Sequence, residues 1–246
     1  MLKVEKITKS FGGVKAVNNC SFEVKKGLIT ALIGPNGCGK TTVFNIISKV
    51  VDKDSGSVIF DGLDISDYSI EKISNIGMSR LFQKSQLFNN LSVEDNLLLA
   101  IDNKDTNLLT NVLGINRITK EKRALVGKML DLIEMKHLKK MLGKELSYGQ
   151  KRLVEIVRVI INPHKFLMFD EPVAGVNPKL REKISKLFKN LKKDNQTLLL
   201  IEHDMNFVFD IADEIIVLDE GGVIAQGTPK QIRNNKRVID IYLGDD

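Results

Sequence analysis

Residues 34–42 read Gly34-Pro35-Asn36-Gly37-Cys38-Gly39-Lys40-Thr41-Thr42, and this stretch decides the fold of the 246-residue chain. It matches the pattern G-x-x-x-x-G-K-[ST] at every fixed position. The apolar run 28–33 before it predicts a buried strand, and the run 41–47 after it predicts a helix. Glycines let backbone N–H groups turn inward around an anion, and the helix N-terminus adds its dipole. The sequence therefore predicts a phosphate-binding loop between a strand and a helix.

Several positions of this loop have an expected role toward a nucleoside triphosphate. Lys40 can reach the β- and γ-phosphates, and the Thr41 hydroxyl can hold Mg²⁺. The alternative, a glycine-rich turn that binds no ligand, is disfavoured because the motif and its strand–loop–helix context are both present. The candidate nucleotide-binding positions are Gly34, Asn36, Gly37, Cys38, Gly39, Lys40, Thr41 and Thr42.

Composition and charge narrow the class of protein. The net charge is +6 and the lysines are scattered, so no basic run is long enough to mark a nucleic-acid groove by itself. A solvated surface is the favoured interpretation, with acidic lipid or a membrane partner as the alternative. No segment approaches the ~18 apolar residues that span a bilayer, and the N-terminus lacks the apolar stretch of a secretory signal. We therefore expect a cytosolic chain.

The two cysteines fit neither a metal-binding pattern nor a disulfide framework. Cys20 alternates with Phe22 and Val24 and is predicted to pack in a core. Cys38 occupies a variable position of the loop and is interpreted as a small filler rather than a catalytic thiol. Lys40 and the nearby helix N-terminus nevertheless predict that its thiolate form is favoured.

Two carboxylates follow a buried strand later in the chain. The run 166–169 is continuously apolar and ends in Asp170 and Glu171, which is typical of a strand buried on both faces of a parallel sheet. Ligands of open α/β sheets bind beyond the carboxyl ends of the strands. Asp170 is therefore predicted to orient Mg²⁺, and Glu171 to polarise a water for attack on the γ-phosphate. His203 ends a similar strand, where core packing and function are equally supported.

The remaining segments predict an α/β fold with a helical insertion. Ser92 is a plausible N-cap, and Ser147 with Gln150 forms an S-x-x-Q capping box before an amphipathic helix. No confident strand is predicted between Phe88 and Ile161. Residues 54–57, Asp-Ser-Gly-Ser, predict a turn before a strand at 58–60. The predicted limits are 1–84 and 162–246 for the nucleotide-binding core, and 85–161 for the helical insertion.

These motifs together resemble the ATP-binding-cassette ATPases. Five motifs occur in the order found in that family: the loop 34–42, Gln83, Leu146-Ser147-Tyr148-Gly149-Gln150, Asp170-Glu171 and His203. The match covers essentially the whole chain. The combination is far more specific than the loop alone, because that loop occurs in many unrelated ATPases. The resemblance implies a P-loop NTPase (RecA-like) core with a small antiparallel β part and a helical insertion, and it implies ATP and Mg²⁺ as ligands.

The resemblance also implies roles for the weaker signals. Phe11 would stack on adenine, where many family members have tyrosine. Gln83 would contact Mg²⁺ or the attacking water and sense the membrane partner, and His203 would hydrogen-bond the γ-phosphate. The implied catalytic residues are Glu171, His203, Lys40 and Gln83, and the implied Mg²⁺ ligands are Thr41, Gln83 and Asp170.

Residues 146–150 correspond to the family's signature sequence. Ser147 and Gly149, with Gln150 beside them, would bind the γ-phosphate of ATP held by a second ATPase subunit in a head-to-tail dimer. Tyr148 replaces the usual first glycine of the signature. Asn177 stands where the family usually has aspartate, although asparagine also caps the helix that Pro178 begins.

Longer segments resemble the ATPase subunit of branched-chain amino acid importers, namely 80–83, 87–88, 93–97, 171–178, 200–205 and the C-terminal segments 227–229, 232–235 and 242–244. This resemblance implies transmembrane permease subunits as partners, a substrate-binding protein as an indirect partner, and a location on the cytoplasmic face of the membrane. No nucleic-acid partner is expected. Three alternatives stay open: a cassette for lipopolysaccharide export or urea uptake, a soluble cassette ATPase acting on nucleic acid or the ribosome, and a regulatory module without turnover.

The segment after Gln83 is the candidate coupling surface. Leu87 and Phe88 are interpreted as an exposed apolar pair that helps form a groove for a short permease helix. The alternative is that both side chains anchor the loop to the core.

Overall fold

A computed structural model describes residues 1–82, 87–101 and 119–243. The chain divides into two compact units. The first unit comprises residues 1–80, 165–171 and 188–246, and the second comprises residues 81–164 and 172–187. The domain limits predicted from the sequence, with the helical insertion at 85–161, stay a prediction.

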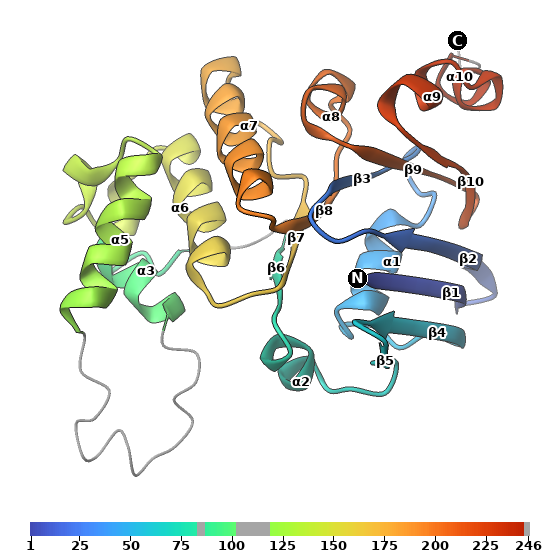
Figure 1. The fold of residues 1–246 in the computed structure, drawn as a ribbon, viewed down its shortest axis with the longest axis horizontal. Helices are drawn as coiled ribbons and strands as arrows, with labels where there is room; N and C mark the ends of the chain where they lie inside the picture. Colours follow the sequence, from blue (N-terminus) through green and yellow to red (C-terminus); the bar gives the residue numbers. More distant parts are fainter. Residues whose placement is uncertain (83–86, 102–118, 244–246) are drawn as a thin grey trace. The chain divides into compact units, whose positions relative to one another are not determined.

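The first unit contains an antiparallel sheet in the order β2-β1-β4-β5 (Figure 1). Its strands are β1 (Leu2–Phe11), β2 (Val14–Val24), β4 (Ser55–Phe60) and β5 (Leu63–Asp64). Cys20, Phe22 and Val24 all point into the core, as their alternation predicts. The turn predicted at 54–57 is wrong, because Ser55 and Ser57 pair with Thr8 and Glu5 of β1.

Gly56 explains why that segment reads as a turn. Its φ is +88°, and a Cβ there would lie 2.4 Å from the Lys6 carbonyl oxygen. The β1–β4 register shifts between Glu5 and Thr8, which is a β-bulge. Glycine therefore marks a close backbone approach within the strand rather than its end.

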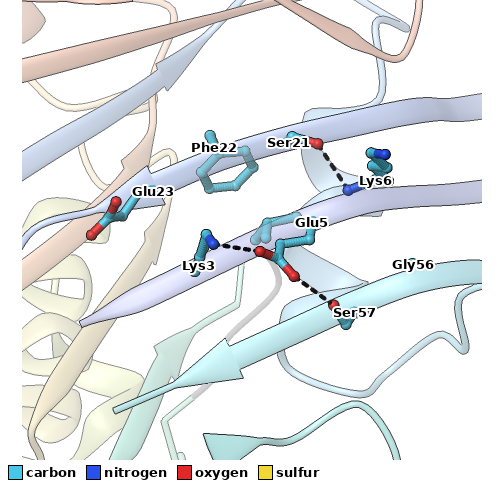
Figure 2. A pocket seen from close by; sticks show the side chains of 9 residues that line it. Lys3, Glu5, Lys6, Ser21, Phe22, Glu23, Gly56 and Ser57 are labelled. Atoms are coloured by element: carbon cyan, nitrogen blue, oxygen red, sulfur yellow. Dashed lines mark hydrogen bonds and ion pairs between the residues drawn. The ribbon is translucent and has the colours of Figure 1, made fainter. Parts of the chain in front are cut away.

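The outer face of this sheet carries a shallow hollow of about 670 Å³ (Figure 2). In it the Glu5 carboxylate lies between the Lys3 ammonium, at 2.5 Å, and the Ser57 hydroxyl, at 3.3 Å. The Lys6 N–H donates to the Ser21 hydroxyl. None of the site residues predicted from the sequence lines this hollow.

The second sheet has the order β10-β9-β3-β8-β7-β6. Its strands are β3 (Ile29–Ile33), β6 (Met78–Leu81), β7 (Phe166–Asp170), β8 (Thr197–Ile201), β9 (Glu214–Asp219) and β10 (Gly222–Gly227). Strands β7, β8, β3 and β9 are parallel, and β10 is antiparallel to β9. Asp170 pairs with Ile201, which pairs with Leu32, so the end of β7 shares one register row with the end of β3.

The helices of the first unit are α1 (Lys40–Ile47), α2 (Ile70–Asn75), α8 (Met205–Ile211), α9 (Pro229–Arg233) and α10 (Lys236–Leu243). Helix α7 (Pro178–Lys193) crosses from the second unit into the first at residue 188. In the first unit the Phe188 ring packs against Phe169 of β7 and Phe207 of α8, with ring centroids 4.6 and 6.3 Å away. These aromatic contacts hold residue 188 of α7 and Phe207 of α8 beside β7 in the first unit.

The second unit is helical. It contains α3 (Val93–Ile101), α5 (Lys120–Leu132), α6 (Tyr148–Ile161) and two short 3₁₀ turns, η1 (Lys136–Leu138) and η2 (Gly143–Glu145). Over residues 87–101 and 119–161 the structure contains no strand, only an isolated bridge between Ser92 and Leu142, as predicted. The Ser92 hydroxyl accepts the Asp95 N–H at 3.0 Å, which confirms the predicted cap.

Candidate functional site

The phosphate loop joins β3 to α1, and two of its glycines, Gly34 and Gly39, are sterically required. Gly34 has φ of +152°, and a Cβ there would lie 2.1 Å from the Leu218 carbonyl oxygen. Gly39 has φ of +102°, and its Cβ would meet the Ala16 carbonyl oxygen at 2.3 Å. Any larger residue at either position would therefore displace backbone on a neighbouring strand or loop. The predicted strand–loop–helix context is confirmed.

Lys40 lies inside the loop, with only 5% of its surface exposed. Its ammonium donates to the carbonyl oxygens of Gly34 and Pro35, both at 2.8 Å, and lies 3.7 Å from the Cys38 sulfur. The loop thus holds a buried positive charge at its centre. Thr41 is exposed at the start of α1, and Asn36 and Gly37 are exposed at the tip of the loop.

Cys38 corrects one expectation. The residue is 4% exposed, and burial raises the pKa of its thiol even though Lys40 opposes this rise. The prediction of a favoured thiolate is wrong, because the free-energy cost of desolvating the thiolate exceeds its favourable interaction with Lys40. Cys20 is fully buried as predicted, and burial raises its pKa to about 12.

Glu171 and His203 lie together beyond the ends of β7 and β8. The His203 Nε2 is 3.3 Å from the Glu171 Oε1. Glu171 has a φ of +49°, and its N–H donates to the Ile201 carbonyl oxygen at 3.0 Å. A left-handed backbone at a non-glycine residue is strained and is frequent at functional sites. The hydrogen bond to β8 holds this conformation and directs the carboxylate toward His203.

Asp170, the last residue of β7, is almost fully buried beside an arginine. Its Oδ2 lies 3.0 Å from Arg80 Nη2, with side-chain exposures of 3% and 6%. No role for Arg80 was predicted from the sequence. Strand β6 reads Met-Ser-Arg-Leu, which is too short and too mixed to indicate that its arginine is buried beside a carboxylate.

The signature residues belong to the second unit, at the start of α6. The Ser147 hydroxyl accepts the Gln150 N–H at 3.3 Å, and the Gln150 side chain accepts the Ser147 N–H at 2.9 Å. The predicted capping box is therefore confirmed. A Cβ at Gly149 would lie 2.7 Å from a methyl carbon of Leu180, so this position has no room for a side chain.

Two of the three departures from the family pattern, Tyr148 and Asn177, have a local structural explanation within the second unit. Tyr148 is 63% exposed, and its hydroxyl donates to the Ala174 carbonyl oxygen at 3.2 Å. The ring therefore extends away from the backbone of the capped helix end. Asn177 accepts the Leu180 N–H at 2.9 Å through its Oδ1 and caps α7.

The remaining predicted positions are Phe11, Gln83, Leu87 and Phe88. Phe11 is 49% exposed, which leaves part of its ring open to a stacking partner, and the Lys9 ammonium lies over the ring, 5.4 Å from its centroid. Gln83 lies outside the described residues. The interpretation of Leu87 and Phe88 as an exposed pair is half wrong, because Leu87 is 6% exposed whereas Phe88 is 56% exposed.

Asn96, whose role the sequence analysis missed, holds the backbone at Phe88. Its Oδ1 accepts the Phe88 N–H at 2.8 Å, and its Nδ2 donates to the carbonyl oxygens of Phe88, Leu91 and Ser92 at 2.9 to 3.3 Å. Asn96 itself is fully buried. The Phe88 side chain is thus presented outward from a fixed segment.

Thr41 and Asp170 are compatible with Mg²⁺ but not with an all-protein metal cage. Within the described ranges no three His, Cys, Asp or Glu side chains converge where they could hold a metal ion. Mg²⁺ on nucleotides needs only one or two protein oxygens, because phosphate oxygens and waters complete its octahedron. The donor set of one hydroxyl and one carboxylate fits that pattern.

Comparison with known proteins identifies the family. A model described as "ABC transporter" matches residues 17–174. A protein of Archaeoglobus fulgidus, "Probable branched-chain amino acid transport ATP-binding protein LivG", is 38% identical over 99% of this chain and 95% of its own length. The chain belongs to the ATP-binding-cassette transporter family. A second model, "Branched-chain amino acid ATP-binding cassette transporter", matches residues 223–246 of this cassette.

Solved structures agree with this assignment and confirm the predicted fold class. The cassette is similar to a nucleotide-free ATP-binding cassette from an ABC transporter, with a TM-score of 0.86, 33% identity and coverage of 100% of this chain and 99% of that one. It is also similar to a dimeric cassette described as a post-hydrolysis state bound to ADP and Pi, with a TM-score of 0.78, 25% identity and coverage of 93% and 99%. The cassette is therefore an ATPase of a transporter complex. None of the helices over residues 1–82, 87–101 and 119–243 combines the length and apolar character needed to span a bilayer.

Proposed function

We propose that this cassette is the ATP-hydrolysing subunit of an importer of branched-chain amino acids. The match of residues 223–246 to the corresponding family model supports the substrate class, as does the name of the Archaeoglobus relative. In this proposal the cassette works on the cytoplasmic face of the membrane, bound to transmembrane permease subunits. A substrate-binding protein delivers the amino acid to the permease and does not touch the cassette.

The observation that carries the catalytic part is the pairing of Glu171 with His203 at 3.3 Å. Glu171 accepts a proton from the attacking water, which increases the nucleophilicity of the water oxygen. His203 hydrogen-bonds the γ-phosphate of bound ATP, next to the Glu171 carboxylate that acts on the water. In the first unit Glu171 and His203 follow β7 and β8. These strands run parallel to β3, the strand that leads into the phosphate loop.

Lys40 and the loop backbone bind the phosphates, and Thr41 and Asp170 hold the Mg²⁺ that accompanies ATP. The phosphate-binding loop is completed by Gly34, Asn36, Gly37, Cys38, Gly39 and Thr42. Phe11 stacks on adenine. When bound, Mg²⁺ neutralises phosphate charge. Lys40 does the same from inside the loop, because its ammonium already lies at the centre of the cradle.

A second ATPase subunit completes the site. Ser147 and Gly149, at the capped N-terminus of α6, bind the γ-phosphate of ATP held by that subunit, and Gln150 keeps the cap in place. The dimeric relative bound to ADP and Pi supports this arrangement. Gln83 senses the permease and contacts Mg²⁺ or the attacking water.

The test is transport by the complete complex in membrane vesicles. Co-expression with the permease subunits should give ATP-dependent uptake of labelled leucine, with competition by excess isoleucine or valine. Excess urea should not compete. Urea uptake without leucine uptake would overturn the proposed substrate. Leucine uptake at the same rate with and without ATP would overturn the proposed role of the cassette.

A further inference from the structure

Arg80 is a buried cation in the first unit, on strand β6. Its side chain is 6% exposed, and its Nη2 lies 3.0 Å from the Oδ2 of Asp170, which is 3% exposed. The two residues are 90 positions apart in the chain. One oxygen of the carboxylate that is proposed to hold Mg²⁺ is thus in contact with a guanidinium.

The same guanidinium also contacts helix α1. Its Nη1 donates to Asn45 Oδ1 at 2.8 Å and to Ser48 Oγ at 2.7 Å. The Ser48 hydroxyl in turn donates to the Phe44 carbonyl oxygen at 2.8 Å, which fixes the direction of its lone pairs. Arg80 therefore joins the end of β7 to the helix that begins with Lys40 and Thr41.

This arrangement is poorly explained by stability. Burial lowers the pKa of Arg80, and the Asp170 carboxylate opposes this change, as expected for a guanidinium that is removed from water beside a carboxylate. Buried ion pairs of this kind are often no more stabilising than apolar residues of similar volume. The planar guanidinium of Arg80 instead fixes the position of the Asp170 carboxylate relative to the side-chain oxygens of Asn45 and Ser48 on α1.

We propose that Arg80 is a positioning residue for Asp170. It holds the Asp170 carboxylate at a fixed place relative to α1, so that Asp170 and the Thr41 hydroxyl can both serve the same Mg²⁺. This inference rests on the proposed function, in which those two side chains hold the ion. Arg80 itself touches neither the nucleotide nor the ion in this account.

The experiment measures how the binding of a fluorescent ATP analogue depends on Mg²⁺ concentration. In Arg80→Lys the charge remains but the fork is lost, so contact with Asp170 or with Asn45 and Ser48 must be given up. The Mg²⁺ concentration for half-maximal effect should rise about 10-fold or more, the usual consequence of losing an outer-shell partner of a metal ligand. Analogue affinity without Mg²⁺ should stay within about twofold of the parent protein. Equal weakening with and without Mg²⁺ would show a merely structural role and overturn the proposal.

Lys25→Met is the matched control. Lys25 lies 3.1 Å from Glu214, a largely buried carboxylate at the beginning of β9, so this variant disrupts another pairing of a cation with a carboxylate of the same sheet. Glu214 is at the amino end of its strand, whereas Asp170 is at the carboxyl end. The control should leave the Mg²⁺ dependence unchanged. A shift as large as that of Arg80→Lys would overturn the proposal.

Asp170→Asn separates the inference from the proposed function. If Asp170→Asn leaves the Mg²⁺ dependence unchanged, the proposed metal role of Asp170 fails. If it raises the Mg²⁺ requirement and Arg80→Lys does not, only the role of Arg80 fails. In the Asp170→Asn background, adding Arg80→Met should change the Mg²⁺ requirement by less than about twofold, because a residue that acts through Asp170 is non-additive with it. A further increase in the Mg²⁺ requirement of the double variant, as large as the increase caused by Arg80→Lys alone, would also overturn the inference.

Discussion

Truncation of Phe88 should separate folding of the cassette from coupling to the permease. Phe88 keeps 56% of its surface exposed, whereas its neighbour Leu87 keeps 6%. Full burial of a phenylalanine contributes ~1.5–3 kcal/mol, so the smaller part that Phe88 buries contributes about 1 kcal/mol. Leu87→Ala removes a buried side chain and should cost ~2–5 kcal/mol. The two substitutions are adjacent in the chain, which makes Leu87→Ala a matched control.

The first measurement is thermal unfolding of the isolated cassette. At ~2–4 °C per kcal/mol for a chain of this size, Phe88→Ala should lower Tm by no more than about 4 °C, and Leu87→Ala by roughly 4–20 °C. Asn96 holds the Phe88 backbone from both sides, so truncation of the ring should not release the segment. ATP binding by Phe88→Ala should equal that of the parent.

The second measurement is co-purification with the permease, beside uptake in vesicles. An aromatic anchor of a helix-in-groove contact typically contributes ≥ ~2 kcal/mol, so Phe88→Ala should weaken co-purification by more than about tenfold. ATP hydrolysis should continue while uptake falls. A large loss of Tm with unchanged binding to the permease would refute this reasoning and assign Phe88 to the core.

Three further predictions concern the loop and a helix cap. Lys40→Ala should weaken nucleotide binding about 10- to 100-fold, because a charged donor to phosphate contributes ~1.5–3 kcal/mol; titration with a fluorescent analogue checks this, and unchanged affinity would contradict it. Cys38 should react slowly with iodoacetamide at neutral pH and faster as the pH rises past the ordinary thiol range, because burial raises its pKa; mass spectrometry should show this dependence and further protection by ATP, and rapid labelling at pH 7 would contradict it. Asn177→Ala should cost about 1 kcal/mol through loss of the α7 cap, whereas Asn177→Asp should retain stability; equal melting temperatures for the two variants would remove the cap as the reason.

Local features of the chain were predictable from the sequence. The capping box of Ser147 and Gln150 involves residues three positions apart, so its chemistry is visible in the sequence. The run that ends at Asp170 is buried on both faces, and its continuous apolar character indicates a parallel strand. The order of these motifs was enough to identify the family and the fold.

Contacts between distant segments were not predictable in the same way. The pairing of Arg80 with Asp170 depends on β6 and β7 being neighbours in the sheet, which no local pattern states. Strand β6 itself has only four residues, too few to establish a period. Gly56 was read as a turn because glycine has the same local signal in a turn and in a bulge.

Competing effects of similar size account for the other errors. At Cys38, desolvation and the charge of Lys40 act in opposite directions, and only the degree of burial decides between them. Leu87 and Phe88 have similar apolar character, yet the hydrogen bonds of Asn96 orient the backbone so that one side chain is buried and the other is exposed.

The proposed role of Glu171 is tested most directly by the turnover of Glu171→Gln. Glutamine keeps the volume of the side chain and the bond from its N–H to Ile201, but it cannot accept the proton of the attacking water. ATP affinity should stay within about twofold of the parent, and hydrolysis should fall about 100- to 10,000-fold, the range of a lost general base. ATPase activity near that of the parent, with ATP still bound, would contradict the assignment of Glu171 as the catalytic base.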